Sequence, residues 1–208
     1  MYIPSAFAET EQEKLHDFIE QHSFATLVSL NGGEPFASHL PVLLEREAAD
    51  QGRLIGHMAK ANPQWKQADG QTVLAIFHGP HTYISPAWYE EENVVPTWNY
   101  VAVHVVGTLR IEDRHEQIAD IVRRYVEFYE SSRAEPWRLD SAEADFISGL
   151  VGGIIGFEID IERIEGKWKL NQNQSEERRQ RVIKALQDGG GEDQLRIAEW
   201  MTANDQSE

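Results

Sequence analysis

The stretch FATLVSLNGGEPFASHLPVLL, residues 24–44, decides the fold class. Its first part, residues 24–30, and its last part, residues 36–44, are rich in apolar and β-branched residues that favour strands. Between them, Asn31, Gly32 and Gly33 accept the left-handed backbone that a tight hairpin turn requires. The stretch therefore predicts a β-hairpin.

Four other segments have strand patterns. Residues 53–58 and 72–77 are short apolar runs, and residues 97–111 are apolar on both alternating faces, which is typical of a central strand. Residues 155–162 alternate isoleucine or phenylalanine with glycine or an acid, which predicts one buried face. About six strands in close succession are thus expected.

Helical patterns lie between and after the strands. Three- and four-residue spacing of apolar side chains predicts helices over residues 10–21 and 116–130, and Ser175 predicts the N-cap of a charged helix that ends near residue 186. Shorter helices are expected to begin near Pro63 and near Asp140-Ser141. Helices at the ends of the strand series, rather than between every pair of strands, favour an α+β antiparallel barrel over a doubly wound parallel sheet.

Length and composition favour a single domain. The chain has 208 residues, of which 41% are hydrophobic, enough for one well-packed core. The three glycines of residues 189–191 predict a flexible break. We therefore expect one domain over residues 1–188 and a flexible acidic tail over residues 189–208, with room in the tail for one more short helix.

The charge balance disfavours several classes of function. Nineteen basic residues against 35 acidic residues give a formal net charge of −16, which would repel nucleic acid and anionic lipid. With no cysteine, disulfides, thiolate metal sites and cysteine nucleophiles are excluded. No apolar run is long enough for a membrane span and the first residues lack a signal pattern, so we expect a cytoplasmic protein.

The common catalytic motifs are missing from the sequence. It contains no GxGxxG, GxxxxGK[ST], GxSxG or HExxH pattern, which disfavours dinucleotide-binding, P-loop, serine hydrolase and zincin chemistry. The close histidine pair, His78 and His81, is expected on a turn. Because no carboxylate or third histidine stands nearby in sequence, we expect these two to form ordinary hydrogen bonds rather than to bind a metal.

Five segments combine aromatic rings with amides, hydroxyls or cations: residues 38–41, 56–65, 83–89, 96–100 and 167–173. Any one such residue is more often structural than functional. Together they suit a planar, phosphorylated ligand, because rings stack on it, amides and histidines bond to its ring edge, and Lys60 with the backbone before Pro63 can receive a phosphate.

These segments also resemble a known family. The motifs MYIPxxF, SHLP, GHMAKANPQW, YISPxWY, VPTWNY and GKWKLxQN occur in this order in a resemblance that spans residues 1 to about 186. By these motifs the sequence is similar to the PaiB-type FMN-binding proteins, described as negative transcriptional regulators of sporulation and protease synthesis. The resemblance implies an FMN-binding split β-barrel, similar to that of pyridoxamine 5'-phosphate oxidases and flavin reductases. It also implies a homodimer with flavin at the subunit interface.

The resemblance assigns roles to particular residues. His39 and His57 would bond to the pyrimidine end of the flavin, Lys60 and its neighbours would meet the phosphate, and residues 167–169 would arrive from the other subunit. The expected cofactor-binding residues are Ser38, His39, Leu40, Pro41, Gly56, His57, Met58, Lys60, Ala61, Asn62, Thr97, Trp98, Asn99, Lys167, Trp168 and Lys169. No catalytic residue is assigned.

Three functions remain open at the level of sequence. The first is an FMN-binding protein with a regulatory output, the second a flavin-dependent oxidoreductase of a small molecule, and the third a split barrel that binds haem through histidine or no cofactor at all. A homodimer is expected because apolar edges around Trp98 and Trp168 would otherwise be exposed.

Direct DNA binding is disfavoured by the residues that surround the one basic cluster. That cluster consists of Arg178, Arg179, Arg181 and Lys184, and Glu176 and Glu177 stand beside it. Helical i,i+4 ion pairing explains the cluster without DNA.

Overall fold

The predicted hairpin is present in the computed structural model, which describes residues 1–205. Strand β2 (Phe24–Asn31) pairs antiparallel with β3 (Glu34–Glu45), in a register that runs from Phe24↔Pro41 to Asn31↔Glu34. Gly32 and Gly33 have φ angles of 62° and 87°, which glycine adopts without strain. The local sequence of the turn thus sets the register.

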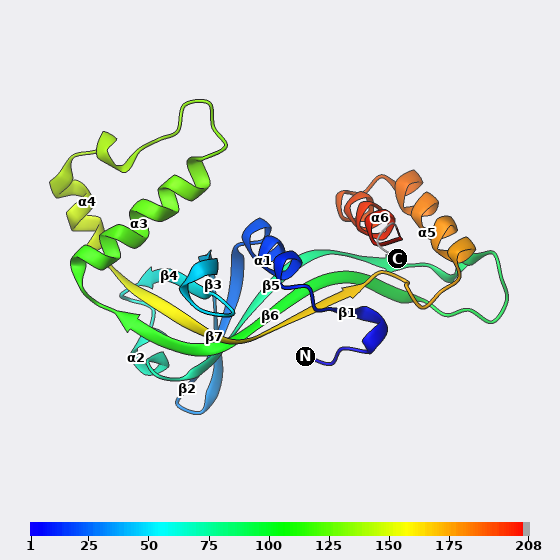
Figure 1. Ribbon diagram of the computed structural model, residues 1–208, viewed down its shortest axis with the longest axis horizontal. Coiled ribbons are helices and arrows are strands. Elements are labelled where there is room, and N and C mark those ends of the chain that lie inside the picture. The colour runs from blue at the N-terminus through cyan, green and yellow to red at the C-terminus, as the bar shows by residue number, and fades with distance from the viewer. Residues whose placement is uncertain (206–208) are drawn as a thin grey trace. The chain divides into compact units, whose positions relative to one another are not determined.

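The hairpin belongs to a seven-stranded antiparallel sheet in the order β1-β7-β4-β3-β2-β5-β6 (Figure 1). An additional pairing of β7 with β6 closes the sheet into a barrel. The other strands are β1 (Ala8–Glu9), β4 (Arg53–Ala59), β5 (Thr72–Ile84), β6 (Thr97–Glu112) and β7 (Ile154–Lys169). The α+β antiparallel barrel is confirmed, and β6 is a central strand, as its two apolar faces predict.

Six α-helices and four short 3-10 helices complete the described chain. The α-helices are α1 (Gln12–Gln21), α2 (Trp65–Ala68), α3 (His115–Glu130), α4 (Ala144–Val151), α5 (Glu176–Gly189) and α6 (Glu192–Asp205). The 3-10 helices are η1 (Ser5–Phe7), η2 (Arg46–Ala48), η3 (Pro86–Tyr89) and η4 (Leu139–Ser141). Ser175 caps α5 as expected, since its hydroxyl accepts a hydrogen bond from the Arg178 N–H at 3.4 Å.

The chain forms two compact units. The first, here called the barrel unit, comprises residues 16–77 and 104–164. Its core contains Leu27, Leu54 and Phe157, each less than 2% exposed. Helix α3 covers the outer side of β3 and β4, where Ile121 and Tyr125 pack against Leu43 and Ile55.

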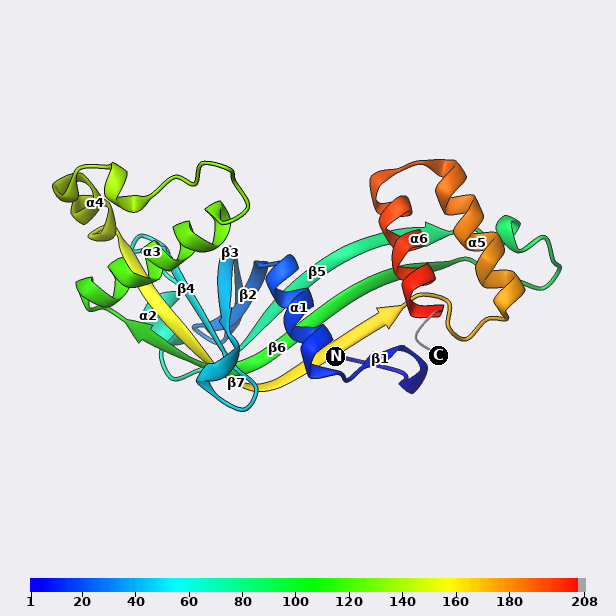
Figure 2. The ribbon, with the colours of Figure 1, turned by 45° about the horizontal axis from the view of Figure 1, so that its top comes forward.

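The second, here called the terminal unit, comprises residues 1–15, 78–103 and 165–208, of which residues up to 205 are described. It contains the end of β5, the start of β6 and the end of β7. It also contains the two helices α5 and α6, which run side by side (Figure 2). Leu186 of α5 and Ile197 and Met201 of α6 are buried. The Trp168 ring packs edge-to-face on Trp200, with 5.6 Å between centroids.

The expected flexible tail over residues 189–208 is wrong for the described residues. Gly190, with a φ of 68°, ends α5, and α6 follows at once. Ile197, Ala198 and Met201 are at most 1% exposed and share one helical face. Abundant acidic residues obscured this short apolar stripe. Residues 206–208 lie outside the described part, and a single domain over residues 1–188 stays a prediction.

Two strands extend further than the sequence suggested. Strand β5 continues to Ile84 and β7 continues to Lys169. His78 and His81 therefore lie within β5 and not on a turn. Within residues 1–205, no group of three or more histidines and acids is arranged to hold a metal ion, and no helix of that range is long and apolar enough to cross a membrane.

The closing pair of strands makes Gly107 of β6 a sensitive position. A Cβ atom there would lie 2.3 Å from the backbone oxygen of Asp160 on β7. Gly107→Ala should therefore lower the free energy of unfolding by about 2–3 kcal/mol. Gly149→Ala in α4, where a Cβ would meet nothing within 4 Å, is the matched control and should raise it by about 0.5–1 kcal/mol. Urea denaturation measures both; an equal effect of the two substitutions would refute a tight β6–β7 contact.

Candidate functional site

The expected cofactor-binding residues fall into two groups. The barrel group, in the barrel unit, comprises residues 38–41 of β3, residues 56–58 of β4, and residues 60–62 of the turn after β4. The terminal group, in the terminal unit, comprises residues 97–99 at the start of β6 and residues 167–169 at the end of β7. Each group is described by itself.

The turn after β4 is held in place by side-chain hydrogen bonds. The Asn62 amide donates to the Ser38 hydroxyl of β3 at 2.8 Å, and its oxygen accepts from the Gln64 N–H at 3.0 Å. The Trp65 indole N–H donates to the Lys60 carbonyl at 3.0 Å. The structure thus places Ser38, Lys60 and Asn62, three of the expected cofactor-binding residues, at one turn.

Lys60 is an exposed cation fixed at this turn. Its N–H donates to the Gly153 carbonyl at 3.0 Å, and its ammonium donates to the Gly152 carbonyl at 2.9 Å. Neither partner is charged, and no carboxylate of the described chain pairs with Lys60. The ammonium is therefore available to a phosphate, which would form a charge-assisted hydrogen bond with it.

His57 carries an unmatched polar atom. Its ring contacts the Tyr125 ring of α3, with 5.0 Å between centroids, and its Nδ1 is buried without a hydrogen-bond partner among the described residues. Burial lowers the pKa of His57, which favours the neutral ring. An unsatisfied buried nitrogen costs about 1–3 kcal/mol, so the position fits a ligand whose polar edge would bond to it. By this observation the barrel group suits a flavin.

Not every residue of the barrel group faces the same way. Side chains alternate along β3, so Ser38 and Leu40 lie on the face opposite to His39 and Pro41. His39 Nδ1 lies 3.1 Å from the Thr26 hydroxyl, and the His39 ring stacks on Phe24.

On β4, Gly56 and Met58 are buried. Together with the alternation on β3, this leaves the backbone and His57, rather than every side chain of the set, to meet a ligand.

The terminal group contains both accessible and covered residues. The Lys169 ammonium donates to the Thr97 hydroxyl and to the Trp98 carbonyl, and the Trp98 side chain is 53% exposed. Asn99 and Trp168 are 0% and 5% exposed because α6 packs over them through Met201 and Trp200. The expectation of an exposed edge at Trp168 is therefore wrong. The sequence suggests one more short helix in this region, but no pattern in it indicates that the helix packs on Asn99 and Trp168.

Lys167 is almost fully buried. Its ammonium donates to the Tyr2 carbonyl at 3.0 Å and lies 5.5 Å and 5.2 Å from the ring centroids of Tyr2 and Tyr100. Cation–π contacts of this kind partly replace the lost hydration of the ammonium. Lys167 thus supports the end of β7 from within the terminal unit.

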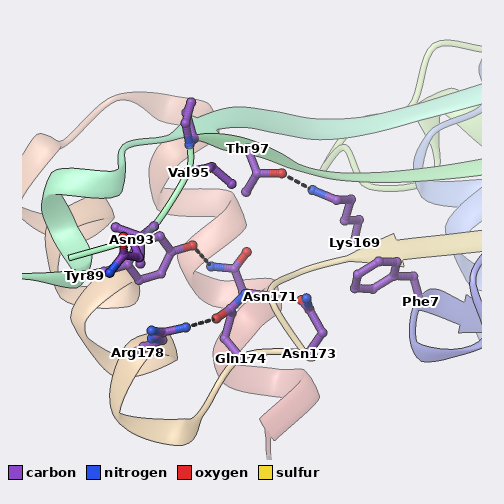
Figure 3. Close-up of a pocket in the computed structure, with 12 residues that line it drawn as sticks. Phe7, Tyr89, Asn93, Val95, Thr97, Lys169, Asn171, Asn173, Gln174 and Arg178 are labelled. Carbon is purple, nitrogen blue, oxygen red and sulfur yellow. Dashed lines mark hydrogen bonds between the residues drawn. The ribbon is translucent and has the colours of Figure 1, made fainter. Parts of the chain in front are cut away.

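The terminal unit also contains a cavity of about 340 Å³ that the sequence did not indicate as a unit. It is lined by Phe7, Tyr89, Asn93, Val94, Val95, Pro96, Thr97, Lys169, Asn171, Asn173, Gln174 and Arg178. Figure 3 shows Lys169 bonded to Thr97 on one side and Tyr89 and Arg178 on the other. We call it the Lys169 cavity. Its lining residues come from three separate stretches of sequence, residue 7, residues 89–97 and residues 169–178, which is why no single motif revealed it.

Fixed polar contacts shape the cavity wall. The Asn171 amide donates to the Tyr89 hydroxyl at 2.9 Å, and the Arg178 guanidinium pairs with Glu91 at 2.5 Å. Burial raises the pKa of Tyr89, and burial together with nearby Lys167 lowers the pKa of Lys169. The phenol thus stays neutral, and Arg178 is already neutralised.

Residues 1–163 match the sequence profile of the family described as "Putative FMN-binding domain". The chain belongs to this family. It is 38% identical over 202 residues to the protease synthase and sporulation protein PAI 2 of Bacillus subtilis, covering 97% of this chain and 96% of that protein. It is 30% identical to an uncharacterised protein of Emericella nidulans, covering 91% and 92% of the two chains. The resemblance to PaiB-type proteins is thereby confirmed.

Solved structures support the fold of this FMN-binding family member. The flavocytochrome Anf3 of Azotobacter vinelandii superposes with a TM-score of 0.58 at 17% identity, covering 78% of this chain and 69% of that chain. The FAD and heme binding protein of Mycobacterium smegmatis superposes with a TM-score of 0.57 at 14% identity, covering 88% and 80%. The chain therefore shares the split β-barrel fold of these two proteins.

The neutral, buried state of His57 predicts a pH dependence of stability. Its pKa is lowered in the folded chain, whereas in the unfolded chain it titrates near 6.5. The unfolded chain therefore binds the proton more readily, and the protein should lose stability as the pH falls below about 6.5. His57→Gln should lose less stability than the wild type between pH 7.5 and pH 5. Urea midpoints at both pH values measure this; identical losses would contradict burial of a neutral His57.

Proposed function

We propose that the protein is a cytoplasmic, homodimeric FMN-binding protein whose output is regulation. The chain is a member of an FMN-binding family. The observation that carries the proposal is that β4 and the turn after it present two polar groups without a full set of partners within residues 1–205: the His57 Nδ1, which has no hydrogen-bond partner there, and the Lys60 ammonium, which has no carboxylate partner there. The similarity to a protease synthase and sporulation protein supports the regulatory part.

The barrel group would hold the flavin by its two polar ends. Lys60, Ala61 and Asn62 would receive the phosphate, and His57 would bond to the ring. The terminal group of the partner subunit would close the site. Within that group, the buried Asn99 and Trp168 would support the exposed residues rather than contact the flavin. Bound FMN supplies reversible electron transfer, and the chain's residues supply binding and orientation.

Lys60→Ala should weaken FMN far more than riboflavin, because only FMN offers a phosphate to the ammonium. A charge-assisted hydrogen bond of about 1.5–3 kcal/mol corresponds to roughly a 10- to 150-fold loss in affinity for FMN. Lys66→Ala, at an exposed lysine on α2, is the matched control and should change neither affinity. Fluorescence titration of both flavins into the apoprotein gives the constants; equal losses for the two ligands would place the phosphate elsewhere.

The outer face of β2 and its neighbours supports a homodimer. By strand register, Phe24 and Leu30 of β2 share this face with Pro35 and Ala37 of β3 and with Ile76 of β5. Phe24 is 65% exposed and Leu30 is 51% exposed. The polar residues Thr26 and His39 lie on the same face and bond to each other. An exposed sheet face that is otherwise apolar normally marks an interface, and a second copy of the chain presents the same face for a symmetric contact.

Phe24→Glu should convert the dimer to a monomer, because it would place two carboxylates in an apolar contact. Phe146→Glu is the matched control, since Phe146 of α4 is 61% exposed and lies off this face; it should stay dimeric. Multi-angle light scattering at micromolar concentration reports the mass. A monomeric wild type, or a dimeric Phe24→Glu, would count against the interface.

The basic residues of α5 support regulation by a route other than DNA contact. Arg178 pairs with Glu91, and Arg181 pairs with Glu177 at 2.6 Å and approaches Glu91. Arg179 donates to the Gln174 carbonyl. These guanidinium groups are engaged within the terminal unit, so contact with phosphates would require breaking ion pairs. Regulation through a protein partner or through flavin chemistry fits a chain of net charge −16 better.

A flavin-dependent oxidoreductase is the second candidate function, and the Lys169 cavity favours it, because a small-molecule site is what a substrate needs. Oxidation of NADH or NADPH with a panel of acceptors distinguishes it from a regulator. The absorption spectrum of the purified protein distinguishes both from a haem-binding protein.

A further inference from the structure

The Lys169 cavity contains a cation that lacks a counter-charge. The Lys169 ammonium is half-buried and donates only to two neutral oxygens, the Thr97 hydroxyl and the Trp98 carbonyl. Its remaining contact is the Phe7 ring, 6.0 Å from the centroid, and no carboxylate of residues 1–205 pairs with it. On a chain with 35 acidic and 19 basic residues, a partly desolvated cation without a carboxylate is unexpected, because burial penalises an unpaired charge.

Unusual backbone conformations gather at the same cavity. Within the described chain, three residues other than glycine have positive φ: Glu90, Asn93 and Asn171, at 53°, 60° and 66°. Asn93 and Asn171 line the cavity, and Glu90 follows the lining residue Tyr89. Such conformations cost energy and concentrate at ligand sites.

The cavity wall indicates the class of ligand. Phe7, Val95 and Pro96 provide apolar surface, and the exposed Asn93 and Asn173 side chains, whose amides form no hydrogen bond within the described chain, provide free polar groups. A volume of about 340 Å³ lies near the lower end of small-molecule sites, roughly 300–1,000 Å³, which suits a small molecule rather than a dinucleotide.

The charges at the cavity narrow the class further. Because Glu91 neutralises Arg178, one uncompensated positive charge, that of Lys169, lines the cavity. We propose that the Lys169 cavity binds a small organic carboxylate with an apolar body, anchored by the Lys169 ammonium and Thr97. This inference rests on the proposed function for its biological meaning, because the carboxylate would be the reactant or the effector of the flavoprotein. Under this inference Lys169 and Thr97, which are expected from the sequence to contact the flavin, bind a second ligand instead.

Benzoate, a planar monocarboxylate, is the probe for a test that needs no flavin. Isothermal titration of the full-length protein as purified, with saturation-transfer NMR, should detect benzoate binding. Lys169→Met should weaken it at least tenfold, and Lys66→Met, an exposed lysine of α2, should leave it unchanged. Asn173→Asp, at an exposed wall residue, should also weaken it at least tenfold by repulsion, and it decides the question if Lys169→Met fails to fold.

Related probes define the outcomes that would overturn the proposal. Benzamide, the neutral analogue, should bind at least tenfold more weakly than benzoate. Equal binding of benzamide, or undiminished binding to Asn173→Asp, would overturn the carboxylate site. Tighter binding of phenyl phosphate would overturn the carboxylate assignment. Displacement of benzoate by FMN would show that the cavity belongs to the flavin's own site, whereas failure of FMN to bind the protein at all would count against the proposed function alone.

Discussion

Closure of the sheet by the pairing of β7 with β6 is the constraint on which the other features of the barrel depend. The two strands approach so closely at Gly107 that its missing side chain is a requirement. On the outer side of the barrel, Asp160 of β7 accepts hydrogen bonds from Arg53 of β4 at 3.0 Å and from Arg110 of β6 at 2.9 Å. Arg110 is the main cause of the lowered pKa of Asp160. One carboxylate therefore links three neighbouring strands across the closure.

The pairing of β7 with its other neighbour in the barrel, β4, positions the barrel group. Strand β4 pairs with β7 from Arg53↔Asp160 to Ala59↔Ile154, so the chain leaves β4 directly beside the start of β7. Lys60, the next residue, bonds to the carbonyls of Gly152 and Gly153 just before that start. The location of the ammonium is therefore a consequence of strand register, and the Asn62–Ser38 bond fixes the following turn to β3.

Features with local causes could be predicted from the sequence, whereas features that depend on distant packing could not. The hairpin follows from its turn, and α5 follows from the Ser175 cap. The second half of β7 has no such signal, since residues 163–166 break the alternation of its first half. Gly166 pairs there with Glu9 of β1, and a Cβ would meet Leu15 at 2.3 Å. The Lys169 cavity could not be predicted either, because its lining residues are far apart in the sequence. The positive φ angles of Asn93 and Asn171, which shape its wall, have no signature in the sequence pattern.

The lysines at the two candidate sites differ from most arginines of this acidic protein, and from Lys14, which pairs with Glu11. Arginines such as Arg46, Arg53 and Arg178 bind carboxylates with their forked donors, while Lys60, Lys167 and Lys169 donate to neutral oxygens. At long range the net charge of −16 repels any anion, but this repulsion is screened beyond about 8 Å at physiological salt. A partly buried ammonium is screened much less. Selectivity for an anionic ligand must therefore come from these few lysines at short range, and not from the field of the whole protein.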